Sequence, residues 1–152
     1  MQIYLASDHA GFYLKEKVKD DFLNRGFLVE DFGAKNFDQA DDYPDFIYPC
    51  VKTYIQKTNG DTNKGIAIIF GASGTGEGIV ADKVRGGRCV VYNGNSSELV
   101  RLGRAHNNCN VLSIGARFVS EKECLEAIKI FMTTQFEGGR HQARVLKIDM
   151  LQ

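Results

Sequence analysis

The sequence has no tryptophan, only two prolines and no excess of charge of either sign. Its 19 basic and 19 acidic residues cancel, which argues against non-specific nucleic-acid binding, because such binding depends on surplus Lys and Arg. No apolar run approaches the roughly 18 residues that suggest a transmembrane helix. Residues 1–5 lack the basic region and long apolar segment of a signal peptide. We therefore expect a cytoplasmic protein without membrane or nucleic-acid partners.

Closely spaced cysteines are also missing. Cys50, Cys89, Cys109 and Cys124 are separated by 39, 20 and 15 residues, so there is no CxxC pair and no zinc-ribbon pattern. We expect reduced thiols, most of them small core residues. The 152 residues, 43% apolar and 25% charged, suit one globular domain. A single domain spanning residues 1–152 is therefore expected.

Short apolar runs alternate with helical spacing along the chain. Strands are predicted at residues 3–6, 27–32, 66–70, 88–92 and 110–114, and helices at about residues 14–22, 44–55, 78–84, 97–105, 120–132 and 140–151. This alternation predicts a single-domain, Rossmann-like, three-layer α/β/α sandwich with a five-stranded parallel sheet. Ligands of such sheets bind beyond the carboxyl ends of the strands, where the strand order reverses. The informative residues should therefore lie directly after strands.

A glycine-rich segment follows the third predicted strand; we call residues 71–78 (GASGTGEG) the glycine loop. It matches neither GxGxxG nor a P-loop, because Gly76 is followed by Glu77 where a P-loop has Lys. Its backbone N–H groups lead into a helix N-terminus, which favours an anion. The alternative is a tight turn in which Glu77 merely complements the helix dipole. A loop that stabilises an oxyanion beside a base is suited to removing a proton next to a carbonyl group.

The three histidines are the second group of candidates. His9 follows the first strand, His106 precedes the fifth, and His141 lies near the carboxyl terminus. Each could be a structural residue. None is three or four residues from another histidine or next to a cysteine, which disfavours a metal site.

Arginines supply a possible phosphate site. Arg140 and Arg144 are four residues apart and so share one helix face, where two guanidinium groups can bind a phosphate with paired hydrogen bonds. The alternative is a solvent-exposed basic helix. Arg117, after the last strand, could join them.

Six segments, in this order, resemble the ribose-5-phosphate isomerase B family, which includes the subunits of bacterial galactose-6-phosphate isomerase. They are residues 7–12 (SDHAGF), 41–44 (DDYP), 71–77 (GASGTGE), 104–108 (RAHNN), 115–117 (GAR) and 138–144 (GGRHQAR). Many members carry a catalytic cysteine at the place of Gly71, whereas a second branch uses a glutamate that corresponds to Glu77. The resemblance covers nearly the whole chain and implies the glutamate branch. Asp82 departs from the asparagine that is common in the family.

The resemblance implies an aldose–ketose isomerase of the pentose phosphate pathway, which interconverts ribose 5-phosphate and ribulose 5-phosphate through a cis-enediolate. Glu77 would transfer the proton between C2 and C1, His106 would open the sugar ring, and Asp8 would help to position the sugar. N–H groups of the glycine loop and the Ser73 side chain would hold the enediolate, Asn107 would bind near the reacting end, and the arginines would bind the phosphate. The implied substrate-binding residues are His9, Tyr43, Ala72, Ser73, Gly74, Thr75, Gly76, Asn107, Arg117, Arg140, His141 and Arg144.

The resemblance implies no metal and no cofactor. In the family the carboxy-terminal arginines come from the neighbouring subunit, so we expect a homodimer or a dimer of dimers with shared active sites, and a carboxy-terminal helix that reaches the partner. We also expect the helix N-terminus to lower the pKa of Glu77, and substrate binding to raise it by expelling water. Alternative functions are isomerisation of a six-carbon sugar phosphate or a free aldose, with residues 36–45 and 93–95 shaping the choice, and non-catalytic binding of a sugar phosphate.

Overall fold

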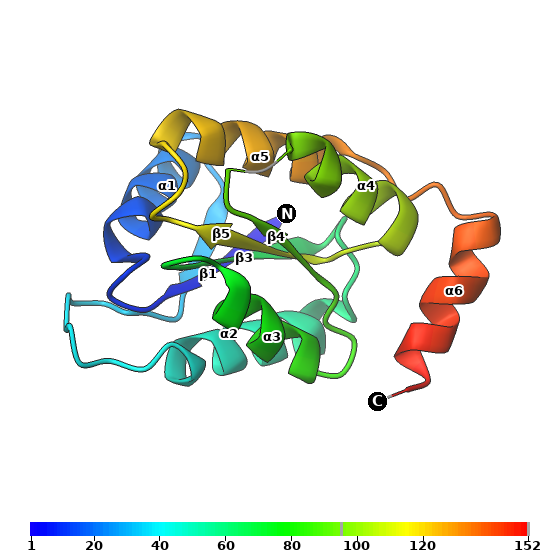
Figure 1. Cartoon of the computed structure of the whole chain (residues 1–152), viewed down its shortest axis with the longest axis horizontal. Helices are drawn as coiled ribbons and strands as arrows, with labels where there is room; N and C mark the ends of the chain where they lie inside the picture. The colour runs from blue at the N-terminus through cyan, green and yellow to red at the C-terminus, as the bar shows by residue number, and fades with distance from the viewer. Residues whose placement is uncertain (95, 152) are drawn as a thin grey trace.

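The computed structural model describes residues 1–94 and 96–151 and has the predicted three-layer α/β/α architecture (Figure 1). Asn95, in the predicted sugar-selecting stretch, and Gln152 lie outside the described residues. The elements in chain order are β1 (Gln2–Ser7), α1 (Phe12–Asn24), β2 (Leu28–Asp31), α2 (Pro44–Thr58), β3 (Gly65–Gly71), α3 (Thr75–Lys83), β4 (Cys89–Tyr92), α4 (Ser97–Asn107), β5 (Val111–Gly115), α5 (Glu121–Thr133) and α6 (Arg140–Asp149).

The sheet is parallel throughout, in the order β2-β1-β3-β5-β4. From β1 the chain moves outward to β2 and then returns to β3 on the other side of β1. The strand order therefore reverses between β1 and β3, where α/β proteins commonly bind ligands. The turn after β1 and the glycine loop after β3 both open at this point.

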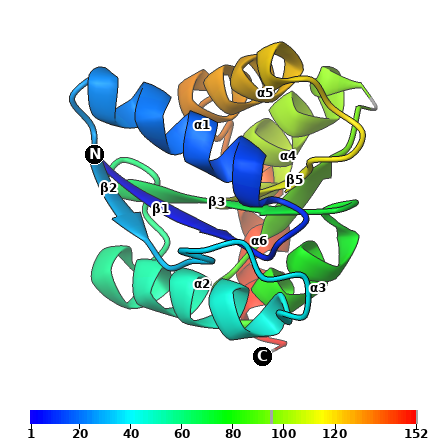
Figure 2. The same cartoon turned by 90° about the vertical axis from the view of Figure 1, so that its left-hand side faces the viewer.

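Helices cover both faces of the sheet. Figures 1 and 2 show α1, α4 and α5 on one face and α2 and α3 on the other. Side chains alternate between the two layers along each strand, as the period of two requires: Ile3 and Leu5 pack beneath α1 and α5, whereas Tyr4 and Ala6 face α2. The sheet is thus a rigid core that positions the loops at its two edges.

Helix α6 stands apart from these layers. It lies beyond α4, at the opposite end of the molecule from the loop between β2 and α2 (Figure 1). An ion pair of 2.8 Å between Arg88 and Asp149 joins its last turn to the start of β4. Leu146 and Ile148 on α6 and Met150 just after it are exposed, so the helix presents apolar surface to solvent.

The predicted elements are confirmed, with boundaries that differ from the predicted ones by up to three residues. Two of these differences concern elements that carry candidate site residues. Helix α3 begins at Thr75 instead of residue 78, because Gly74, with a φ of 77°, turns the chain directly into the helix. This places Glu77 in the first helical turn. Helix α6 ends at Asp149 instead of residue 151. The predicted capping box at Ser120 and Glu123 is present and begins α5.

The cysteines and helices agree with the expected class of protein. All four cysteines are free, and Cys50, Cys109 and Cys124 are buried. Among residues 1–94 and 96–151, no helix combines the length and apolarity that spanning a bilayer requires.

Candidate active site

Asp8 shapes the turn after β1. Its side chain is buried, and Oδ1 accepts hydrogen bonds from the N–H groups of Ala10 (2.9 Å) and Gly11 (3.1 Å). These bonds hold the entry to α1 at the carboxyl edge of the sheet, the edge at which the strands end. The charge of Asp8 also acts on Glu77, so the two carboxylates are electrostatic neighbours.

The glycine loop presents unpaired backbone donors at the same edge. In the described part of the chain, the N–H groups of Ser73, Gly74 and Gly76 donate to no protein acceptor, whereas the N–H of Thr75 is 3.3 Å from Ser73 Oγ. Ser113 Oγ donates to Gly74 O at 2.6 Å and fixes the loop from below. Free donors held in a rigid turn at a helix N-terminus suit an oxyanion.

The carboxylate of Glu77 fills the space beside Gly71. Glu77 is only 4% exposed, and a Cβ added at Gly71 would overlap its carboxylate oxygens. A side chain at residue 71 and this position of Glu77 therefore exclude each other. The Glu77 carboxylate lies where a cysteine at residue 71 would place its Cβ.

Burial raises the pKa of Glu77; the hydrogen bond from its own N–H opposes this, and the charge of Asp8 adds to it. The expected lowering by the helix N-terminus is wrong as a net direction, because removal of the carboxylate from water outweighs the dipole. The protein itself raises this pKa without help from substrate. A raised pKa brings a carboxylate closer to the range in which it exchanges protons efficiently near neutral pH.

The loop between β2 and α2, residues 32–43, covers this edge, and we call it the β2–α2 loop. Its Asp41 lies 2.6 Å from His9, measured between Oδ1 and Nδ1. Its Tyr43 packs against the glycine loop, since a Cβ added at Gly76 would meet the Tyr43 ring at 2.9 Å. The loop therefore brings two side chains to the site from a segment distant in sequence.

Arg117 completes the carboxyl edge. It follows β5, its side chain is exposed, and its N–H donates to Ala72 O at 3.1 Å. Its charge acts on His9, lowering the pKa that the hydrogen bond to Asp41 raises. His9 and Arg117 are thus electrostatic neighbours at this edge.

The opposite, amino edge of the sheet carries a second group of candidates. His106, in the last turn of α4, and His141, in the first turn of α6, stack face to face, with ring centroids 4.2 Å apart and planes 6° apart. Glu137 Oε2 lies 3.5 Å from His106 Nε2 and 4.0 Å from His141 Nε2. The N–H of Glu137 donates to Ala105 O at 3.0 Å, which ties the connection between α5 and α6 to the end of α4.

The electrostatics of this pair favour a neutral His141. Burial lowers the pKa of His141, and the positive charges of His106, Arg140 and Arg144 lower it further, against the opposing charge of Glu137. Arg140 and Arg144 are both exposed on α6, as is Asn107 at the end of α4. These cationic and polar groups face solvent without a carboxylate partner among the described ion pairs.

The structure divides the predicted site residues between the two edges. Asp8, His9, Tyr43, the glycine loop and Arg117 lie at the carboxyl edge, whereas His106, Asn107, Arg140, His141 and Arg144 lie at the amino edge, around α4 and α6 (Figure 1). The five residues of β5 span roughly 15 Å, so a pentose phosphate at Glu77 does not reach His106 of the same chain. We expected the arginines to come from a neighbour, but not that His106 and Asn107 would lie with them.

Two clusters offer three possible metal ligands within 4.8 Å of one another: His106, Glu137 and His141, and Asp8, His9 and Asp41. A metal ion lies in the plane of each imidazole that binds it, and the parallel rings of His106 and His141 do not converge on one point. In the second cluster, His9 Nδ1 and Asp41 Oδ1 are 2.6 Å apart, the distance of a shared proton, whereas two ligands about 2.1 Å from one ion stand about 3 Å apart. The second cluster therefore holds a hydrogen-bonded pair, and in the first the ring nitrogens do not converge on a common ligand position.

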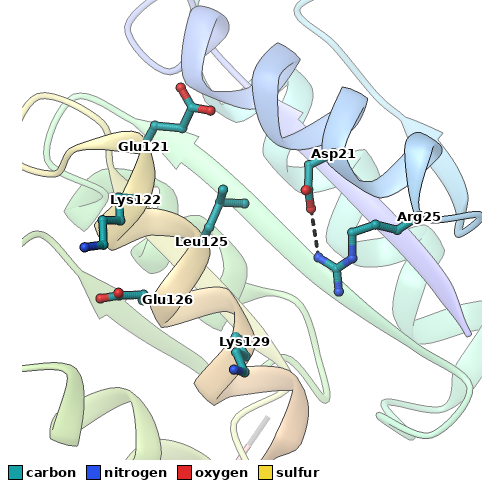
Figure 3. Close-up of a pocket in the computed structure, with 7 residues that line it drawn as sticks. All are labelled: Asp21, Arg25, Glu121, Lys122, Leu125, Glu126 and Lys129. Carbon is teal, nitrogen blue, oxygen red and sulfur yellow. Dashed lines mark hydrogen bonds and ion pairs between the residues drawn. The ribbon is translucent and has the colours of Figure 1, made fainter.

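A hollow of about 650 Å³ lies elsewhere, between α1 and α5. Figure 3 shows Leu125 at its centre and charged side chains of both signs around it, among them the Asp21–Arg25 ion pair. None of the predicted site residues lines it. The candidate site is therefore defined by its reactive groups and not by this hollow.

Sequence reasoning assigned no role to Asp41 or Glu137. Asp41 belongs to the segment 41–44 that carries the resemblance, so a signal was present, whereas no spacing pointed to Glu137. The departure at Asp82 has a structural reading: its Oδ1 accepts the N–H of Cys89 at 2.8 Å, and an asparagine would accept the same hydrogen bond. Burial raises the pKa of Asp82.

Comparison with known proteins gives consistent matches over nearly the whole chain. The family described as Ribose/Galactose Isomerase matches residues 3–148. Probable ribose-5-phosphate isomerase B of Mycoplasma genitalium is 36% identical over 146 residues, covering 96% of this chain and 92% of that protein. Ribose-5-phosphate isomerase B of Mycobacterium tuberculosis is 36% identical over 146 residues, covering 95% and 86%.

Solved structures also match this chain over nearly its whole length. Ribose-5-phosphate isomerase B from Mycoplasma genitalium, with bound ribulose-5-phosphate, has a TM-score of 0.89 and 35% identity, covering 99% of this chain and 95% of that one. Ribose 5-phosphate isomerase from Thermotoga maritima has a TM-score of 0.87 and 35% identity, covering 98% and 97%.

Proposed function

Because this chain belongs to the ribose/galactose isomerase family, we propose that it interconverts ribose 5-phosphate and ribulose 5-phosphate with Glu77 as the base. The observation that carries the proposal is the buried Glu77 carboxylate, seated in the space beside Gly71 and next to free N–H groups of the glycine loop. A base beside an oxyanion hole is the combination that enolisation next to a carbonyl group requires.

The proton transfer follows from this geometry. Glu77 takes the proton from C2 of the open-chain aldose, and the electrons of the broken C–H bond form the C1–C2 double bond of the enediolate. The negative charge on oxygen is held by the N–H groups of Ser73, Gly74 and Gly76. Glu77 then returns its proton to C1, while the hydroxyl proton passes from O2 to O1. Loss of a comparable oxyanion donor costs about 10²–10³ in rate in other enzymes.

We propose further that the site is completed by a second copy of the chain. Glu77 and His106 lie at opposite edges of one sheet, so His106, with Asn107, serves the Glu77 of a partner. There His106 donates a proton to the ring oxygen and opens the furanose. Arg140 and Arg144 of the same partner then join His9 and Arg117 around the phosphate. The exposed apolar residues at the end of the chain, from Leu146 onward, favour such a contact.

The activity is tested by proton NMR in D₂O with ribose 5-phosphate and EDTA. Ribulose 5-phosphate with deuterium at C1 is the expected product, and Glu77→Gln should abolish its formation while leaving substrate binding largely intact. Turnover by Glu77→Gln would overturn the assignment of the base. If ribose 5-phosphate is inert with the folded wild type, the same assay with six-carbon sugar phosphates and free aldoses distinguishes another isomerase from a binding protein.

The shared site is tested by mixing two inactive variants. Co-expressed Glu77→Gln and His106→Asn chains form mixed dimers in which one of the two sites has both residues intact. Random pairing should restore about a quarter of wild-type activity, because half of the dimers are mixed and each has one working site. Recovery confined to the mixture supports the shared site, and no recovery by folded mixed dimers contradicts it.

A further inference from the structure

Asp41 makes two contacts with one residue. Its Oδ1 accepts the backbone N–H of His9 at 3.0 Å and lies 2.6 Å from the Nδ1 of the same histidine. The Asp41 side chain is 8% exposed, and its second oxygen, Oδ2, is buried without a hydrogen-bond partner in the described part of the chain. Burying a carboxylate with one oxygen unpaired is costly, so this pair differs from an ordinary surface ion pair.

The contact determines how His9 faces the site. When Nδ1–H donates to Asp41, the other ring nitrogen, Nε2, points away from the carboxylate. The two ring nitrogens of a histidine are distinct in this way, and the hydrogen bond made by one sets the role of the other. Arg117, which lies close enough to act on the charge of His9, is the neighbouring cation at this edge.

The same contact holds the β2–α2 loop in place. Within that loop, the Phe37 ring meets His9 edge-on at 6.2 Å and stacks on Tyr13 at 5.6 Å. Tyr43, at the end of the loop, packs against Gly76. Asp41 lies between Phe37 and Tyr43 in the sequence, and its hydrogen bonds to His9 join the loop to the turn after β1.

We propose that Asp41 is a positioning residue, which directs Nε2 of His9 toward the substrate phosphate and fixes the β2–α2 loop over the glycine loop. The inference rests on the proposed function, because it takes His9 to be a phosphate ligand. In the described part of the chain, the hydrogen bonds of the Asp41 side chain go only to His9, so its effect on the reaction passes through that residue.

The charges around His9 agree in direction with this role. The hydrogen bond to Asp41 raises the pKa of His9; desolvation opposes this, the charge of Asp8 and of Asp41 adds to it, and Arg117 opposes it. His9 therefore keeps its positive charge to higher pH. A phosphate monoester loses its second proton near pH 6, so a histidine that remains charged above that pH binds the dianion with a charge-assisted hydrogen bond.

The test compares Asp41→Asn, which removes the charge but keeps an acceptor, with Asp41→Ala, which removes both. Asp38→Asn is the control, because Asp38 lies in the same loop, is exposed, and its carboxylate accepts only the N–H of Ala40 among the described residues. Each protein is labelled with ¹⁵N-histidine and titrated by NMR. We expect His9 to titrate at lower pH in both Asp41 variants and unchanged in the control. Equal titration of His9 in the wild type and Asp41→Asn would overturn the proposal.

Inorganic phosphate is the probe for the anion site. At a pH above the titration of His9 in the variants, both Asp41 variants should bind phosphate about tenfold more weakly than the wild type. At lower pH, where His9 is protonated in every protein, Asp41→Asn should recover wild-type affinity and Asp41→Ala should recover less. A uniform loss of affinity at all pH values would indicate a merely structural role and contradict the proposal.

The outcomes separate this inference from the proposed function. If the wild type isomerises ribose 5-phosphate and Asp41→Asn changes neither the titration of His9 nor the KM, the inference fails and the function stands. If the wild type isomerises no sugar, the function fails, while the titration and the phosphate affinity still decide the role of Asp41. If the variants do not fold, the same NMR measurement on the wild type tests the proposal through the tautomer of neutral His9. A proton on Nδ1 is expected, and a proton on Nε2 would contradict the proposal.

Discussion

The Glu77 carboxylate occupies the space that a side chain at residue 71 would fill, so the position of Glu77 requires glycine at residue 71. Gly71 ends β3, and Glu77 lies six residues later in the first turn of α3. The glycine loop between them folds back so that the two residues meet. Because Gly71 has no side chain, the long side chain of Glu77 fits beside it at the carboxyl edge of the sheet.

Replacing Gly71 with alanine should displace this carboxylate. The overlap is with the far end of a flexible side chain, so we expect Glu77 to rotate away while the fold is kept. The kcat should fall by about 10²–10⁴, the range that general-base catalysis contributes, with little change in the urea unfolding midpoint. Steady-state kinetics measures the kcat, and a urea titration measures the unfolding midpoint. Wild-type kcat in a folded Gly71→Ala protein would mean that Glu77 acts from another orientation.

Glu77→Gln should make the protein more stable at neutral pH. Because burial raises the pKa of Glu77 in the folded state, the folded protein holds this proton more tightly than the unfolded chain does. Stability from this group is therefore lost as pH rises through the folded pKa, and the neutral glutamine avoids that loss. Urea unfolding at several pH values should show a gain for Glu77→Gln at pH 7–8 that shrinks toward acid pH. A gain that is independent of pH would contradict the linkage.

Lys15→Met should destabilise the protein strongly. Lys15 is fully buried and bonds to Asp31 at 2.8 and 2.9 Å and to Glu16 at 2.6 Å. Removing one partner of such a pair leaves the other charge buried, at a cost of about 3–5 kcal/mol. Urea unfolding at pH 7 measures this loss, with Lys17→Met on the exposed face of α1 as the control. A loss no larger than that of the control would mean that Lys19 alone compensates Asp31.

The same cluster predicts a loss of stability in acid. Although burial raises the pKa of Asp31, hydrogen bonds from Lys15, Lys19 and the Gly33 N–H outweigh it, and the net direction is downward. The stabilisation is present above the ordinary aspartate pKa of about 3.9 and is lost as pH falls through the lower folded value. Below pH 4, the free energy of unfolding should therefore decrease more steeply with falling pH for the wild type than for Asp31→Asn, as urea unfolding at several pH values would measure.

Arg140→Ala should weaken phosphorylated substrates. If Arg140 binds the phosphate in an assembled site, its loss should cost about 2–5 kcal/mol of binding, as truncation of a charged hydrogen-bond partner does elsewhere. This would appear as a raised KM for ribose 5-phosphate. Lys147→Ala removes a charge from the last turn of the same helix and should leave the KM unchanged. Equal KM values for wild type and Arg140→Ala would make α6 an ordinary solvated surface.

Local patterns were sufficient to predict the order and type of the elements. The apolar run at residues 66–70 and the capping box at Ser120 depend only on neighbouring residues, and both are confirmed. The position of Asp8 and the glycine loop at the carboxyl edge also followed, because each directly follows a parallel strand. These features need no knowledge of long-range packing.

Long-range placement was predicted less well. His106 directly precedes a strand, which in a parallel sheet means the opposite edge from Glu77, and this signal was available in the sequence. The pKa of Glu77 was different, because its direction depends on burial against Gly71 and on the charge of Asp8, which comes from another strand. A short stretch of sequence does not show how deeply a side chain is buried from solvent in the folded protein.

Because Glu77 and His106 lie at opposite edges of the sheet, the proposed shared site makes the activity depend on the concentration of the protein. If the site is shared as proposed, a single chain has Glu77 but no His106 within reach of a closed sugar ring, so it can act only on the small open-chain fraction of the sugar. Specific activity should then decline on dilution, as the proposed pairs dissociate. At low protein concentration, the proposed enzyme would therefore isomerise sugar only as fast as the ring opens without help.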